Sequence, residues 1–255
     1  MRKSKALAKI RAGKPVRMCV MGHFIPPFVH MAARANFDCI WLDLEHRLIP
    51  EQQLQALLTH FQLADIDCML RPSTLEKSRL YRYLEDGAAG LMIPHVSTAE
   101  KAEMLVQSVK FPPLGDRGLD GAGLDTRYTL MDAKEYADAA NRETFLVVQI
   151  ETPEAIENVD AIAAVEGVDG IFVGPGDLGL RLRTYPDLPS LDECIERAAA
   201  AAKRHGKAWG MPAGTPEALK KYTAMGAQLL AHGSDFGAIM GTIEASARNL
   251  DEALG

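Results

Sequence analysis

Two acidic residues, Glu151 and Asp177, each follow an apolar stretch in the second half of the chain. Gln149 stands two positions before Glu151, so in a β-strand both side chains point to the same side. Neighbouring strands lie about 4.8 Å apart, which allows the two carboxylates to share one ion. Two carboxylates, completed by water and substrate oxygens, suit a hard divalent cation such as Mg²⁺ or Mn²⁺. Alternatively, both acids cap helices, since Glu151 precedes Thr152-Pro153.

A second group of polar residues lies in the first half of the chain. His46 is a candidate proton carrier because imidazole titrates near neutrality, and Asp43 or Glu45 is close enough in sequence to orient it. Arg71 ends an apolar stretch before a proline, where its guanidinium can hold a carboxylate in a fork or stabilise an oxyanion. The alternatives are a structural histidine and a salt bridge from Arg71 to an acid on a neighbouring strand.

The elements that must position these residues are short apolar stretches alternating with segments of helical spacing, such as Leu54, Leu57, Leu58 and Phe61. The apolar stretches are nearly continuous, as in parallel strands covered by helices. Eight such units in 255 residues favour one domain, residues 1–255, folded as a (β/α)₈ TIM barrel. An open doubly wound sheet is the alternative. The predicted strands are Met18–Gly22, Cys39–Leu44, Cys68–Arg71, Gly90–His95, Phe145–Glu151, Gly170–Gly174, Ala208–Pro212 and Gln228–His232.

Active sites of such barrels lie at the carboxyl ends of the strands, where the acidic, basic and imidazole groups named above are found. Lysine is absent from all eight predicted strands, and Lys207 precedes its strand at the wrong end. A Schiff-base aldolase needs a lysine inside the barrel or at its mouth. The sequence therefore disfavours imine chemistry and leaves a metal as the electrophile.

The connections between the predicted strands are short, with one exception. The segment from Lys110 to Asn141 is long and glycine-rich, which indicates a functional loop. Glycines at 87, 167, 206 and 226 are expected to end helices. The first fourteen residues are basic, and we expect them to form a solvated helix.

Composition excludes several classes of protein. A net charge of −6 without a basic stripe argues against a nucleic-acid partner, and no stretch approaches the ~20 apolar residues of a membrane span. Charged residues make up 24% and hydrophobic residues 47% of the chain, as in an ordinary globular protein. The four cysteines form no CxxC pair, which predicts buried thiols in a reducing cytoplasm.

At these residues the sequence resembles the HpcH/HpaI aldolase family, which includes aldolases of 4-hydroxy-2-oxoheptanedioate and of 2-keto-3-deoxy sugar acids. The resemblance covers almost the whole chain, and its D-x-E-H, Q-x-E and G-P-x-D elements are specific in combination. It is carried by FDCIWLDLEH, LRPS, DGAAGLMIPHVSTAEKAE, PPLGDRG, VVQIET, ENVDAIAAVEGVDGIFVGPGDLG and GKAWG.

The resemblance implies a barrel of the phosphoenolpyruvate/pyruvate superfamily with a swapped C-terminal helix, commonly assembled as a hexamer. It implies a class II aldolase, a lyase that reversibly cleaves a 4-hydroxy-2-oxo acid to pyruvate and an aldehyde through an enolate. The divalent metal, Mg²⁺, Mn²⁺ or Co²⁺, would be held by the acids at 151 and 177.

The resemblance also implies roles for the remaining residues. Arg71 would stabilise the enolate oxygen, and Gln149, the backbone at Gly176 and Asp177 would help to bind pyruvate. His46, aided by Asp43, would move protons through a water on the metal. Glu85 would reach a neighbouring subunit's site, in a position where the family usually has aspartate.

The chain departs from the family in three places where the aldehyde partner is expected. These are His23 in the first loop, His95 in the sequence Pro-His-Val, and the loop Gly115–Tyr128. His95 and the Gly-Pro-Gly-Asp element are also similar to macrophomate synthase, a relative that decarboxylates oxaloacetate and uses the enolate. Oxaloacetate decarboxylation and a catalytically silent barrel that binds 2-oxo acids therefore stay as alternatives.

Overall fold

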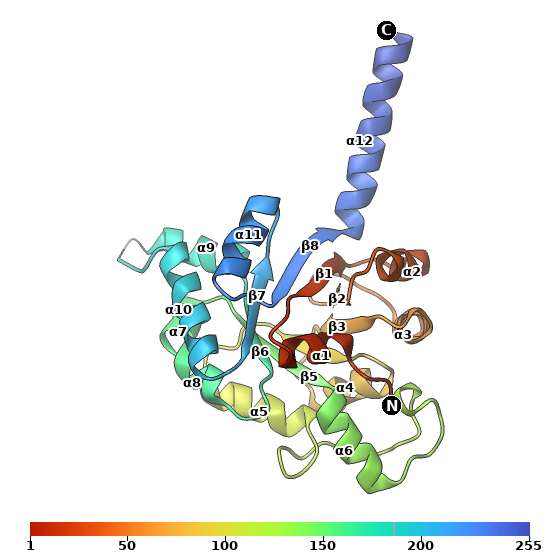
Figure 1. Ribbon diagram of the computed structural model, residues 1–255, viewed down its shortest axis with the longest axis vertical. Helices are drawn as coiled ribbons and strands as arrows, with labels where there is room; N and C mark the ends of the chain where they lie inside the picture. Colours follow the sequence, from red (N-terminus) through yellow and green to blue (C-terminus); the bar gives the residue numbers. More distant parts are fainter. Residues whose placement is uncertain (186) are drawn as a thin grey trace.

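The computed structural model describes residues 1–185 and 187–255 and contains a closed barrel of eight parallel strands, paired in sequence order from β1 to β8, with β8 against β1. Figure 1 shows the barrel with helices around it. The predicted (β/α)₈ fold is confirmed, and the open doubly wound sheet is wrong. The strands are β1 (Val16–Met21), β2 (Cys39–Asp43), β3 (Asp67–Arg71), β4 (Gly90–Ile93), β5 (Phe145–Ile150), β6 (Gly170–Val173), β7 (Ala208–Pro212) and β8 (Leu229–Ser234).

The helices begin where the sequence supplies capping groups. Thr98, Thr152 and Thr215 each accept a hydrogen bond from a backbone N–H of the first turn, and Ser190 forms a capping box with Glu193. The helices are α1 (Lys5–Arg11), α2 (Pro26–Arg34), α3 (Glu51–Ala64), α4 (Lys77–Glu85), α5 (Ala99–Val109), the 3₁₀ turn η1 (Leu124–Thr126), α6 (Ala133–Glu143), α7 (Pro153–Glu157), α8 (Val159–Ala164), α9 (Pro175–Thr184), α10 (Leu191–Arg204), α11 (Pro216–Ala224) and α12 (Asp235–Leu254).

Side-chain alternation along the strands separates the inside of the barrel from its helix-covered outside. In β5, Phe145 and Val147 belong to the cluster of buried residues inside the barrel, whereas Leu146 and Val148 pack in the larger cluster under the helices. The same alternation directs the next inward positions of β5 to the barrel mouth. The inner cluster consists of Ala6, Leu7, Val16, Met18, Cys39, Trp41, Met69, Ala89, Met92, Phe145, Val147, Phe172, Ala208, Leu229 and Ala231.

The basic N-terminal segment closes the bottom of the barrel. Helix α1 forms as predicted, but Ala6 and Leu7 are buried in the inner cluster, so the expectation of a solvated helix is wrong. Asp67, at the start of β3, is fully buried and accepts hydrogen bonds from the Ser4 hydroxyl at 2.7 Å and the Ala6 N–H at 2.8 Å. Arg2 adds an ion pair to the same carboxylate. This network fixes α1 beneath the barrel.

The long connection after α5 is partly helical. The turn η1 and most of helix α6 lie within the segment predicted as one loop, and α6 continues two residues beyond it. Tyr136, on α6, is fully buried and donates a hydrogen bond to Asp125 at 2.7 Å, while Arg117 contacts its hydroxyl at 2.8 Å. The irregular part of this segment is therefore shorter than the sequence predicts. The reason is that its second half forms a helix, which Tyr136 holds against the first half.

The glycines predicted to end helices, at positions 87, 167, 206 and 226, all have positive φ values between 65° and 107°. The four cysteines are buried free thiols, as expected. Burial raises the pKa of the Cys19 thiol to about 12, with a further increase from the charge of Asp235.

The last helix, α12, extends away from the barrel and carries the C-terminus (Figure 1). Within the described residues no helix is long and apolar enough to cross a membrane. Several large apolar side chains of α12 are nevertheless exposed, namely Phe236, Ile239, Met240, Ile243, Leu250 and Leu254.

Candidate active site

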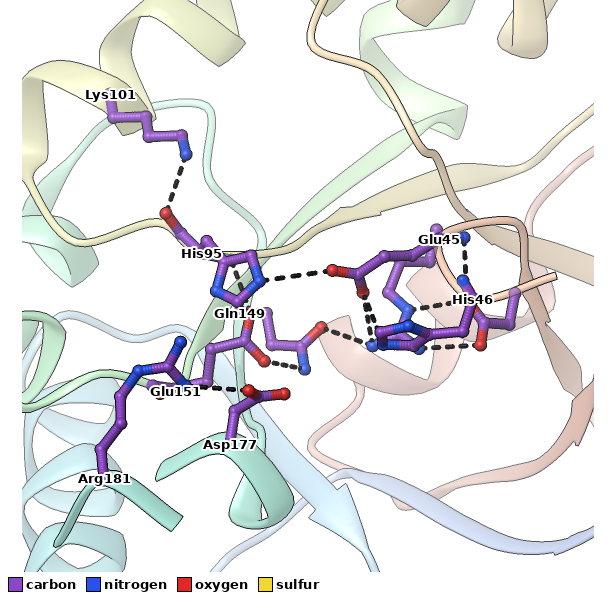
Figure 2. Close-up of polar contacts among 10 residues, drawn as sticks. Glu45, His46, His95, Lys101, Gln149, Glu151, Asp177 and Arg181 are labelled. Carbon is purple, nitrogen blue, oxygen red and sulfur yellow. Dashed lines mark hydrogen bonds and ion pairs between the residues drawn. The ribbon is translucent and has the colours of Figure 1, made fainter. Parts of the chain in front are cut away.

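The polar residues predicted from the sequence meet at the carboxyl ends of β2, β3 and β5. Asp43 and Arg71 are paired in register on neighbouring strands. Gln149 continues the inward alternation of β5, and Glu151 follows directly after that strand. Figure 2 shows Gln149 and Glu151 in the same region as Glu45, His46 and His95.

The guanidinium of Arg71 is the centre of the first half of the site. It forms a fork with Asp43, in which Nε and Nη2 lie 3.0 and 2.8 Å from the two carboxylate oxygens. Its Nη1 is 2.9 Å from Glu45 and donates to Gln149 Oε1 at 3.3 Å. Arg71 also lies over the ring of Trp41. The predicted salt bridge to a strand acid is thus real, and the same contacts hold the guanidinium at the mouth.

Asp43 is a buried acid with a lowered pKa. Burial opposes ionisation, but the hydrogen bonds and positive charge of Arg71, together with the backbone N–H groups of Glu45 and His46, outweigh it and lower the pKa of Asp43. Asp43 contacts His46 only through that backbone N–H, at 3.5 Å. The imidazole of His46 instead lies 3.5 Å from Glu45 and is 56% exposed. Of the two acids considered for orienting His46, Glu45 is the one against the ring.

Glu151 is 1% exposed and forms the second half of the site. Its Oε2 accepts a hydrogen bond from Gln149 Nε2 at 2.5 Å, and its Oε1 accepts the backbone N–H of His95 at 2.6 Å. Burial raises the pKa of Glu151, and the negative charges of Glu45 and Asp177 raise it further, against the opposing effect of His95. A buried carboxylate facing two other carboxylates is an environment that a bound cation would stabilise.

Asp177 lies in the first turn of α9 and is partly exposed. Its carboxylate pairs with Arg181 at 2.9 Å, and the same arginine donates to the backbone carbonyl of Glu151 at 3.4 Å. Arg181 therefore connects the Asp177 side chain to the backbone of Glu151, and Figure 2 shows the two acidic side chains near each other. Residues 1–185 and 187–255 contain no set of three or more His, Cys, Asp or Glu side chains arranged to hold a metal. Two carboxylates, if completed by non-protein oxygens, would suit a hard divalent ion.

Two glycines shape this part of the mouth. A Cβ at Gly174 would lie 2.5 Å from Glu151 Oε2 and 2.6 Å from Gln149 Nε2, so the site requires a residue without a side chain there. A Cβ at Gly176 would meet no atom within 4 Å. No other side chain therefore covers the backbone at Gly176.

Glu85 is not part of this cluster within one chain. It is the last residue of α4, which returns to the bottom of the barrel, and it lies 3.7 Å from Arg117. Burial raises its pKa, against the charge of Arg117. The turn after Gly123 packs beside it, since a Cβ at Gly123 would lie 2.6 Å from the carbonyl oxygen of Glu85. Part of the loop Gly115–Tyr128 is therefore at the bottom of the same barrel and not at its mouth.

Sequence reasoning did not assign roles to several residues of the site. His95 lies 3.0 Å through Nδ1 from Glu151 and 3.4 Å through Nε2 from Glu45. Lys101 donates to the His95 carbonyl at 2.8 Å. The signal for His95 was its departure from the family pattern, whereas Glu45 was noticed only as a neighbour of His46. His23, also left open, lies 2.9 Å from Asp235 at the junction of β8 and α12.

The structure defines a (β/α)₈ barrel with a cluster of polar side chains at its mouth, and comparison with known proteins supplies the family. Residues 18–241 match the family described as HpcH/HpaI aldolase/citrate lyase. The chain is 34% identical over 237 residues to a hydroxypyruvate/pyruvate aldolase of Pseudomonas aeruginosa, covering 91% of this chain and 87% of that protein.

Two further relatives agree. The chain is 35% identical to a 2-keto-3-deoxy-L-rhamnonate aldolase of Klebsiella pneumoniae, covering 80% of this chain and 77% of that protein. A solved HpcH/HpaI aldolase from Desulfitobacterium hafniense superposes with a TM-score of 0.89 at 30% identity, covering 96% of each chain. The chain belongs to the HpcH/HpaI aldolase/citrate lyase family, and the prediction of a carbon–carbon lyase of the aldolase type is confirmed.

Proposed function

We propose that this chain is a divalent-metal-dependent aldolase that cleaves a 4-hydroxy-2-oxo acid to pyruvate and an aldehyde, and catalyses the reverse addition. The observation that carries the proposal is the buried Glu151, which faces Asp177 and Glu45 beside the guanidinium of Arg71. Lysine is absent from all eight strands, so an imine mechanism has no nucleophile inside the barrel.

Glu151 and Asp177 would hold the cation, with Mg²⁺ or Mn²⁺ favoured by the all-oxygen donor set and Co²⁺ as an alternative. When bound, such an ion polarises the carbonyl of a 2-oxo acid and stabilises negative charge on its oxygen. Gln149, held between Arg71 and Glu151, and the open backbone at Gly176 would orient the pyruvate unit.

Arg71 would act on the enolate of pyruvate, and His46 would act on the hydroxyl that is derived from the aldehyde. Arg71 is fixed by Asp43 and Glu45, so its donors are oriented before substrate arrives and can stabilise an enolate oxygen without rearrangement. The partly exposed imidazole of His46, with Glu45 at its side, would accept the proton of the 4-hydroxyl during cleavage and return it during addition.

We also propose that the protein assembles with further copies of itself. The exposed apolar face of α12 supports this, because such a surface is costly in water. An apolar cavity of about 290 Å³ on the outer side of β1 and β8, lined by Phe37, Leu219 and Leu230 among others, offers a place for a neighbour's helix. A hexamer with swapped helices, in which Glu85 reaches a neighbouring mouth, follows from the family resemblance. Cytoplasmic location is part of the same proposal.

The test is an assay of pyruvate release from several 4-hydroxy-2-oxo acids by purified protein, with Mg²⁺, Mn²⁺, Co²⁺ or chelator. We expect turnover only with metal, and the same protein should consume pyruvate and an aldehyde in the reverse direction. Loss of oxaloacetate without any aldol turnover would support a decarboxylase instead. No activity on any acid, together with retained 2-oxo-acid binding, would support the silent barrel.

A further inference from the structure

Five side chains at the mouth form a closed ring of polar contacts. They come from β3 and β5 and from the loops that follow β2, β4 and β5. Arg71 Nη1 contacts Glu45 at 2.9 Å and Gln149 Oε1 at 3.3 Å, and Gln149 Nε2 contacts Glu151 Oε2 at 2.5 Å. His95 completes the circuit, with Nδ1 3.0 Å from Glu151 Oε1 and Nε2 3.4 Å from Glu45 Oε1. Figure 2 shows His95 between the two carboxylates.

The backbone of His95 is held in a conformation that ordinary residues avoid. Its φ is +54°, in the left-handed region, where the Cβ of an L-residue comes too close to the following carbonyl oxygen. Two contacts hold the residue there: its N–H donates to Glu151 Oε1 at 2.6 Å, and its carbonyl accepts from Lys101 at 2.8 Å. Strain retained by surrounding contacts is a recurring feature of functional sites.

The contacts of Glu151 are divided between its two oxygens. Oε1 receives both the N–H and the ring nitrogen of His95, and Oε2 receives the amide of Gln149. A carboxylate gripped at both oxygens cannot rotate freely about its terminal bond. Since a ligand that is already oriented loses less entropy on binding an ion, these contacts favour metal binding at Glu151.

The same imidazole also connects the two halves of the site. Glu45, which contacts His95 through Oε1, contacts both Arg71 and His46 through Oε2. Removal of the His95 ring would leave Glu45 oriented by Arg71 and His46 alone. It would also leave Oε1 of Glu151 with a single donor, the backbone N–H.

We propose that His95 is a positioning residue whose imidazole closes this ring and holds the Glu151 carboxylate in the orientation that binds the cation. The inference rests on the proposed metal site at Glu151 and Asp177 and adds a residue to it. The contribution of the ring can be separated from that of the backbone, because His95→Gly keeps the N–H donor and relieves the left-handed strain. His95→Asn keeps a side-chain donor and tolerates positive φ.

The experiment measures Mn²⁺ affinity of metal-free protein by electron paramagnetic resonance of the free ion, without substrate. We expect His95→Gly to bind Mn²⁺ about 10–100-fold more weakly than wild type, the usual effect of removing a group that orients a metal ligand. His95→Asn should recover most of that loss. His60→Gln, which replaces a histidine of α3 that pairs with His30 and not with the mouth, is the matched control and should bind as wild type.

Thermal unfolding of each variant shows whether it is folded. Wild-type protein that fails to bind Mn²⁺ would overturn the proposed metal site and, with it, this inference. If wild type binds but His95→Gly binds as tightly, only the role of His95 is overturned. A purely structural role predicts that any weakening follows the loss of thermal stability, whereas we expect His95→Gly to weaken Mn²⁺ binding while remaining as stable as wild type.

Discussion

Each end of this barrel buries a carboxylate, but the groups that surround the two carboxylates differ. At the bottom, Asp67 is surrounded by donors: the hydroxyl of Ser4, the N–H of Ala6 and the guanidinium of Arg2. At the mouth, Glu151 has two neutral donors and His95, yet it faces the acids Glu45 and Asp177, and burial raises its pKa. A buried acid saturated with donors stabilises the fold, whereas a buried acid facing other acids is one that a divalent cation would stabilise.

The two ends also differ in how open they are. At the bottom, the Ser4 hydroxyl and the Ala6 N–H both donate to Asp67, so helix α1 lies across this end of the barrel. The mouth leaves the backbone of Gly176 open and the ring of His46 exposed. The like charges of Glu45, Glu151 and Asp177 therefore lie at the end of the barrel opposite the donors that surround Asp67.

The largest expected effect is on catalysis at the mouth. Asp177→Asn should lower kcat/KM for aldol cleavage about 1000-fold, because the cation would lose one of two carboxylate ligands. The unfolding free energy should change by less than ~0.5 kcal/mol, since the side chain is partly exposed. Asp192→Asn is the matched control, because Asp192 is also a first-turn acid paired with a basic residue, Lys221. Equal kcat/KM values for the two variants would contradict the assignment of Asp177 to the cation site.

The second expected effect is on stability at the bottom. Asp67→Asn should lower the unfolding free energy by about 3 kcal/mol, because it leaves the guanidinium of Arg2 without its buried partner. For a chain of this size the midpoint of thermal unfolding should fall by roughly 6–12 °C. The kcat and metal affinity of the folded variant should match wild type. A folded Asp67→Asn protein with impaired metal binding would show that the two ends are coupled.

A smaller effect on stability is expected for Asp43. This residue lies at the mouth, but hydrogen-bond donors surround its carboxylate. Its folded-state pKa is lowered, so ionised Asp43 stabilises the fold above the unfolded pKa of about 4, and this stabilisation is lost as the pH falls through the folded-state value. Asp43→Asn should therefore cost about 2 kcal/mol at pH 7 and progressively less below pH 4. Urea unfolding at several pH values measures this. A deficit that is constant with pH would contradict it.

Most of the barrel could be predicted because the sequence signals for its strands and helices lie close to those elements. Strand periodicity, helix caps and terminal glycines all lie within a few residues of the element they specify. The bounds of β4 and β5 were predicted one or two residues too long, to His95 and Glu151. In β4 the reason is the left-handed backbone of His95, which leaves the extended region and depends on a contact with a residue 56 positions away.

The residues of the candidate site could be predicted from the sequence, but most of the contacts between them could not. The sequence placed Arg71, Gln149, Glu151 and Asp177 at one end of the barrel, and the structure brings them together. It could not show that Glu45 contacts three of the site's groups, because those contacts depend on the register between strands. The closure of the bottom by α1 was also missed, since the partner of that basic segment, Asp67, is distant in sequence and had no sign of its role.

The most direct test is a titration of metal-free protein with Mn²⁺, comparing wild type with Glu151→Gln. The glutamine has the same shape but no charge, so it keeps the packing of the mouth and removes the acid that faces Glu45 and Asp177. We expect one Mn²⁺ to bind per chain in wild type, and the variant to bind Mn²⁺ at least ~100-fold more weakly. Equal affinity in the two proteins would show that the cation site is elsewhere.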